Sequence, residues 1–131
     1  MEKKQMRELI AKAKTAKTRS YSPYSGFSVG AALLCDDGDV ILGCNIENAA
    51  FSPTCCAERV AIFSALSSGK RSFSAIAVVG DSSPCLPCGV CRQVMSEFCK
   101  KEMPVICEDK NGEPLAFSLG ELLPHSFDLE K

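Results

Sequence analysis

Two short cysteine motifs contain the residues of this chain that are best suited to chemistry. Cys56 and Glu58 stand two apart, and Cys88 and Cys91 follow in a later Pro-Cys-Gly-Val-Cys segment. Three thiolates with an open fourth position are typical of a catalytic zinc site, because structural zinc sites close the tetrahedron with four protein ligands. The pattern predicts one zinc ion held by Cys56, Cys88 and Cys91, with Glu58 beside it as an acid or base.

The spacing also indicates which elements position these side chains. Cys88 and Cys91 are three apart and share one face of a helical turn. Cys56 and Glu58 point to nearly opposite sides of a regular helix, so both reach one metal only if Cys56 is the cap. We therefore expect two helix N-termini at the metal, where the helix dipoles favour thiolate over thiol. Three thiolates and one Zn²⁺ leave a negative charge, and Arg59 is placed to draw off part of it by hydrogen bonding to sulfur.

The remaining cysteines leave other ligand sets open. The chain has nine cysteines, and Cys55 or Cys85 could replace a ligand or complete a closed four-sulfur site. A closed site would make the protein a structural zinc module used for binding, with no need for Glu58. Cys35, Cys44, Cys99 and Cys107 fall in predicted strands or at a helix end, as expected of small buried side chains. His125, the one histidine, belongs to neither metal motif.

Hydrophobic patterning predicts helices that alternate with strands along the whole chain. Residues 1–19 form an amphipathic pattern whose basic face is expected in solvent. The predicted strands are 27–35, 40–46, 73–79, 105–108 and 115–118, and the predicted helices are 56–67, 89–99 and a short one near 121. We expect one α/β domain over residues 1–131, with three α/β/α layers and a mixed sheet of about five strands.

Composition limits the classes of partner. The net charge of −1 offers no general attraction for polynucleotides, and no apolar run reaches the length of a membrane span. An odd number of cysteines without an apolar signal segment indicates reduced thiols and a cytoplasmic location. We therefore expect neither a nucleic acid nor a membrane as partner.

Several segments along the chain resemble one family. Besides the two cysteine motifs with Arg59, Arg92 and Gln93, they are residues 23–32, residues 43–49 and residues 121–127. The chain is similar to the small homotetrameric cytidine deaminases, in their three-cysteine form. The resemblance covers nearly the whole chain.

The resemblance implies an activity. It is the hydrolytic deamination of cytidine and 2'-deoxycytidine to uridine and 2'-deoxyuridine plus ammonia, a reaction of pyrimidine salvage. Zinc-bound hydroxide would attack C4 of the base, and Glu58 would shuttle the protons. Other nucleoside deaminases, such as the blasticidin type, share the zinc core and remain an alternative.

The resemblance also assigns substrate contacts. Asn45 and Glu47 are two apart on a predicted strand, so both project from one face, and in the family these positions bind ribose. The family places Phe27 against the pyrimidine and uses the backbone of Ala57 to contact the base. It also implies a homotetramer in which Phe127 of a neighbouring chain closes over the substrate.

Overall fold

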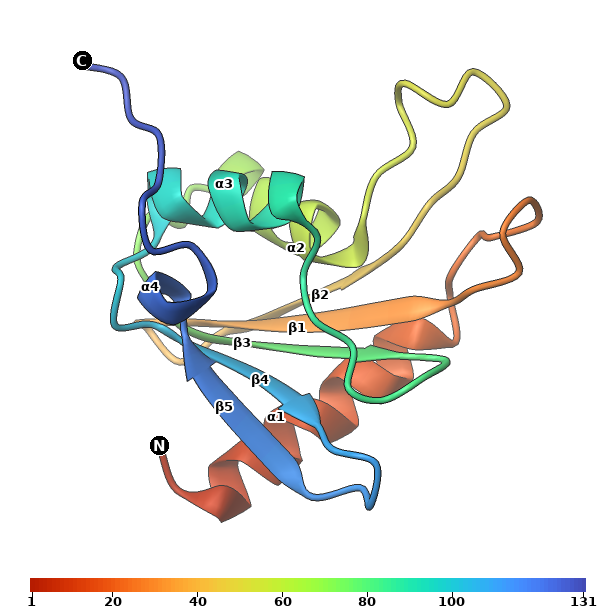
Figure 1. Cartoon of the computed structure of the whole chain (residues 1–131), viewed down its shortest axis with the longest axis horizontal. Coiled ribbons are helices and arrows are strands. Elements are labelled where there is room, and N and C mark those ends of the chain that lie inside the picture. The colour runs from red at the N-terminus through yellow and green to blue at the C-terminus, as the bar shows by residue number, and fades with distance from the viewer.

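The computed structural model describes residues 1–131 as a five-stranded sheet with helices on both faces (Figure 1). Helices α2 and α3 cover one face together with α4, and α1 crosses the other. The elements are α1 (Lys3–Lys17), β1 (Val29–Cys35), β2 (Val40–Cys44), α2 (Ala57–Ser67), β3 (Phe73–Gly80), α3 (Gly89–Phe98), β4 (Pro104–Glu108), β5 (Pro114–Ser118) and α4 (Leu119–Leu122). The predicted α/β class, three layers and mixed sheet are confirmed.

The strand order β2-β1-β3-β4-β5 explains why the sheet is mixed. The β1–β2, β1–β3 and β4–β5 pairs are antiparallel, whereas β3 and β4 are parallel. Parallel neighbours need a crossover connection, and α3 supplies it. The crossover brings the segment before α3 to the face of the sheet that α2 already covers, so the two cysteine motifs share one layer.

Two apolar clusters hold the layers together, one on each face of the sheet. Along β3, Ala77 and Val79 pack in a cluster with residues of α1, while Ile76 and Val78 pack in a cluster with residues of α2 and α3. The alternation follows from the two-residue period of a strand whose two faces are both covered. From α1 the buried residues are Leu9, Ile10, Ala13 and Ala16, which confirms the predicted amphipathic helix.

Two predicted strand ends are wrong by two residues, and both lie at the substrate-contact segments. The strand predicted from residue 27 begins at Val29, and the strand predicted to residue 46 ends at Cys44. Asn45 and Glu47 therefore lie beyond β2 and not on it. The chain turns away there because Ile46 pairs instead with Tyr21 and Cys55 in isolated bridges.

No helix combines the length and apolar character needed to cross a lipid bilayer.

Candidate active site

The first turns of α2 and α3 bring the two cysteine motifs together. Cys56 is the N-cap of α2 and Cys88 the N-cap of α3, and both have extended backbone angles. The prediction that Cys56 caps its helix is confirmed. Cap geometry lets the Cys56 side chain turn toward the metal motif of α3 while Glu58, in the first helical turn, remains close to the same point.

The three predicted ligand sulfurs form one cluster. The Sγ atoms of Cys56, Cys88 and Cys91 all lie within 4.8 Å of one another, and those of Cys56 and Cys88 are 3.8 Å apart. A tetrahedral zinc with Zn–S bonds of about 2.3 Å places neighbouring sulfurs about 3.8 Å apart. The donor type, number and spacing therefore fit zinc.

The other candidate ligands stand outside this cluster. Neither Cys55 nor Cys85 belongs to it. Burial raises the pKa of the Cys85 thiol to about 11 and also raises the pKa of Cys55, as expected of inert packed thiols. His125 is exposed near the C-terminus. Within this chain no fourth cysteine closes the site.

Glu58 is the one charged side chain of the protein that is buried, with 3% of its surface exposed. Burial raises the pKa of its carboxyl group from 4.5 to about 7, and the nearby Cys56 thiolate acts in the same direction. A carboxyl group that titrates near neutral pH can both take up and release a proton under ordinary conditions.

Arg59 lies against the sulfur cluster. Its Nη2 donates to Cys56 Sγ at 3.4 Å, and its Nε is buried with no hydrogen-bond partner. Hydrogen bonding from Cys91, followed by that from Arg59 and Cys88, lowers the pKa of Cys56 to about 5 against the opposing effect of burial. The contact with Cys56 in turn raises the pKa of Arg59. The guanidinium thus contacts a ligand sulfur, as its predicted role requires.

The predicted ribose residues bind the segment that leads into β1. Asn45 Nδ2 donates to the Phe27 carbonyl at 2.8 Å, and Asn45 Oδ1 accepts from the Val29 N–H at 2.9 Å. Glu47 Oε1 accepts from the N–H groups of Tyr24 and Ser25, which together with the Ser25 hydroxyl lower the pKa of Glu47. Both side chains are therefore fixed by the chain itself, and each keeps hydrogen-bonding capacity for a ligand.

The two remaining predicted contacts differ in their surroundings. Ala57 is fully buried as the first residue of α2. Phe127 lies in the C-terminal tail with 66% of its surface exposed, and its carbonyl accepts from Gln93 Nε2 at 2.7 Å. The Phe127 ring thus has little cover from its own chain.

Sequence reasoning missed two residues that shape the site. Arg92 Nε donates to the Pro87 carbonyl at 2.8 Å and Arg92 Nη1 to the Leu122 carbonyl at 2.9 Å, which ties the Cys88 loop to the end of α4. Gly43 lies beneath α2, where an added Cβ would be 2.4 Å from the Ala57 carbonyl oxygen. A glycine inside a strand signals such a close approach, so Gly43 could have been noticed.

Comparison with known proteins identifies the family. The model of the cytidine and deoxycytidylate deaminase zinc-binding region matches residues 3–107. The chain belongs to this family. It is a zinc-dependent deaminase, and zinc is its cofactor.

Individual relatives agree over nearly the full length. The cytidine deaminase of Sporosarcina psychrophila is 52% identical over 124 residues, which cover 94% of this chain and 91% of the relative. The cytidine deaminase of Mycobacterium tuberculosis is 42% identical over 123 residues, which cover 93% of this chain and 89% of the relative. The crystal structure of the Burkholderia pseudomallei cytidine deaminase superposes with a TM-score of 0.88 at 49% identity and covers 92% of this chain and 98% of that one.

Proposed function

We propose that the enzyme hydrolyses cytidine and 2'-deoxycytidine to uridine and 2'-deoxyuridine plus ammonia, as a reaction of pyrimidine salvage. The observation that carries this proposal is the convergence of three thiols and one buried carboxyl group at the ends of α2 and α3. Membership of the deaminase family gives the class of reaction. The names of the close relatives support cytidine as the substrate.

Cys56, Cys88 and Cys91 would hold one zinc ion per chain. When bound, zinc lowers the pKa of a water ligand toward neutrality and so supplies a hydroxide nucleophile. The N-termini of α2 and α3 present their positive dipole ends at this cluster, and Arg59 would offset part of the negative charge on sulfur. With three protein ligands, the fourth coordination position of the zinc would be left to water or substrate, as in catalytic sites.

Glu58 would move the protons of the reaction. As a carboxylate it would take one proton from the attacking water and deliver it to ring N3, and it would then take the remaining proton of that oxygen and deliver it to the departing amine. Burial supports this double role, because it destabilises the charged form and brings the two protonation states close in free energy. In the zinc-free chain the pKa of about 7 reflects that balance.

Four residues would orient the nucleoside. Asn45 would donate a hydrogen bond to a ribose hydroxyl and Glu47 would accept one, Phe27 would pack on the pyrimidine face, and the Ala57 backbone would contact the base. Ribose recognition is tested by Asn45→Ala and Glu47→Ala, which are expected to lower kcat/KM for cytidine far more than for free cytosine. Equal losses for the two substrates would remove this assignment.

A homotetramer would complete the site. The Phe127 ring is exposed on its own chain and would cover a substrate bound in a neighbouring chain, because a single domain of 131 residues has little surface to enclose a ligand alone. We also propose that residues 1–131 are one domain and that the enzyme is cytoplasmic. Sedimentation across a dilution series, with turnover measured in parallel, tests the shared site. A monomer with intact turnover would exclude it.

Glu58→Gln tests the mechanism directly. The variant is expected to keep its zinc and to lose uridine formation by about 10²-fold or more, because an amide cannot carry the protons. Glu121→Gln is the matched control, since Glu121 also lies in the first turn of a helix but is exposed. Full activity of Glu58→Gln would falsify the proposed proton shuttle.

A further inference from the structure

The segment that carries Phe27 continues beyond the end of the sheet. The ladder between β1 and β3 ends at the pair Val29 and Gly80. Phe27 and Ser28 have no strand partner, and Gly26 before them has a φ of 67°. Backbone of this kind is free to move unless side chains satisfy its N–H and carbonyl groups. What holds this segment therefore decides where the Phe27 ring lies.

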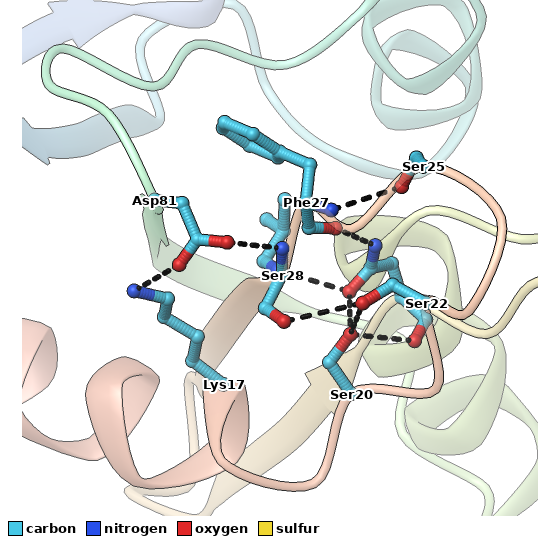
Figure 2. Close-up of polar contacts among 9 residues, drawn as sticks. Lys17, Ser20, Ser22, Ser25, Phe27, Ser28 and Asp81 are labelled. Carbon is cyan, nitrogen blue, oxygen red and sulfur yellow. Dashed lines mark hydrogen bonds and ion pairs between the residues drawn. The ribbon is translucent and has the colours of Figure 1, made fainter.

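Asp81 holds the segment from the β3 side. It directly follows β3, and its Oδ2 accepts from the Ser28 N–H at 2.7 Å. Its Oδ1 lies 2.7 Å from Nζ of Lys17, the last residue of α1. Figure 2 shows the carboxylate between these two partners. The side chain thus extends the ladder by one hydrogen bond where the backbone of β3 no longer does.

The segment is also held on its other side, and its ring lies near the end of β3. Asn45, which follows β2, binds the Phe27 carbonyl and the Val29 N–H. The ring itself passes close to the end of β3, where a Cβ at Gly80 would lie 3.0 Å from Phe27 Cε1. Figure 2 shows the Phe27 ring pointing away from the polar contacts that hold its backbone.

We propose that Asp81, oriented by Lys17, is a positioning residue that sets the Phe27 ring for nucleoside binding. The inference rests on the proposed contact between Phe27 and the pyrimidine. Asp81 is linked to Phe27 through the N–H of the adjacent Ser28, while its other oxygen is held by Lys17. Loss of the Asp81 side chain is expected to weaken binding of the substrate in the ground state and in the transition state equally, so KM rises and kcat changes little.

The two partners of Asp81 contribute unequally. Lys17 and Asp81 are 29% and 39% exposed, and ion pairs this open to solvent contribute little by themselves. A backbone N–H that donates to a carboxylate is a stronger interaction. Removal of the Ser28 contact should therefore matter more than removal of the ion pair. This ranking separates Asp81 from an ordinary surface salt bridge.

Variants that remove these contacts one at a time test the inference in the zinc-loaded enzyme. Asp81→Ala is expected to raise the KM for cytidine about tenfold, with kcat within about threefold. Asp81→Asn keeps an oxygen that can accept from Ser28 and is expected to restore KM to within about threefold. Lys17→Met is likewise expected to keep KM within about threefold of the wild-type value. Amide hydrogen exchange should show loss of protection at Ser28 in Asp81→Ala and recovery in Asp81→Asn.

A double-mutant cycle with Phe27→Ala shows whether Asp81 acts through the ring. In the Phe27→Ala background, Asp81→Ala is expected to change KM less than about twofold, because the residue that it positions is gone. Asp109→Ala is the matched control: Asp109 also accepts backbone N–H groups, from Asn111 and Glu113, but it closes the β4–β5 turn. That control is expected to leave KM unchanged.

The outcomes distinguish this inference from the proposed function. If Phe27→Ala raises KM and Asp81→Ala does not, the positioning role is overturned and the pyrimidine contact stands. Equal effects of Asp81→Ala in both backgrounds would likewise overturn it. If Phe27→Ala leaves KM unchanged, the pyrimidine contact itself is wrong and the inference falls with it.

Discussion

Replacing Gly43 by alanine is expected to displace the first turn of α2 from the metal ligands of α3. In the structure, a Cβ at Gly43 would lie 2.4 Å from the Ala57 carbonyl oxygen and 2.6 Å from the Ala61 backbone nitrogen. Both contacts are to helix backbone, which cannot rotate aside as a side chain could. Since ordinary contacts of this kind need about 3.5 Å, α2 must retreat by about 1 Å.

A displacement of this size is large for a metal site and for catalysis. Bond lengths to zinc tolerate about 0.2 Å, so Cys56 could no longer share the ion with Cys88 and Cys91 without strain. Misplacement of catalytic groups by about 1 Å typically costs about 10²-fold in rate. We expect kcat/KM to fall about 10²-fold and zinc to dissociate faster, with a loss of about 1–3 kcal/mol of stability from overpacking.

The assay compares Gly43→Ala with Gly120→Ala. Gly120 lies in α4, and an added Cβ there would come no closer than 3.4 Å to its nearest neighbours in Lys101, so this control should keep wild-type zinc content and activity. Zinc per chain is measured after dialysis against a chelator, kcat/KM by uridine formation, and folding by circular dichroism at the assay temperature. A folded Gly43→Ala variant with wild-type zinc content and kcat/KM would refute the reasoning.

Three further predictions concern stability and metal retention. In the zinc-free chain the folded state raises the pKa of Glu58 from 4.5 to about 7, so the stability linked to this proton is present below pH 4.5 and lost as pH rises through 7. In urea titrations of the zinc-free chains, the free energy of unfolding of Glu58→Gln is therefore expected to exceed that of the wild type by up to about 3 kcal/mol above pH 7 and to equal it below pH 4.5. A difference in unfolding free energy that stays constant across pH would contradict this. In Arg92→Lys, a single ammonium group replaces the guanidinium that donates to both the Pro87 and Leu122 carbonyls, so we expect faster transfer of zinc to a chelator. The control is Arg71→Lys, because the native Arg71 side chain donates to a carbonyl outside the site. Equal transfer rates from the two variants would argue against a bracing role for Arg92. Met95→Ala empties a fully buried position and is expected to cost about 2–5 kcal/mol in urea unfolding, and a cost below about 1 kcal/mol would mean that the core collapses around it.

The metal site could be predicted from sequence because its constraints are local. The two-residue gap between Cys56 and Glu58 requires a helix cap, and the three-residue gap between Cys88 and Cys91 requires a helical turn. Both requirements hold in the structure. The nearly continuous apolar run over residues 73–79 likewise predicts a strand covered on both faces, and β3 is such a strand.

The ends of β1 and β2 could not be predicted in this way. Phe27 continues the apolar run of β1, and Ile46 continues that of β2, so local pattern extends both strands too far. In the structure, contacts between distant segments decide these ends: Ile46 pairs with Tyr21 and Cys55, and Ser28 binds Asp81. An aspartate after a strand looks like an ordinary loop residue, so the sequence offered no signal for the role of Asp81.

X-ray absorption at the zinc edge of the purified enzyme tests the central claim most directly, because it counts the atoms bound to the metal. We expect three sulfur atoms at about 2.3 Å and one oxygen or nitrogen atom at about 2.0 Å, with the sulfur count reduced to two in Cys88→Ser and unchanged in Cys85→Ser. Four sulfur atoms around zinc in the unmodified enzyme would contradict an open catalytic position beside Glu58.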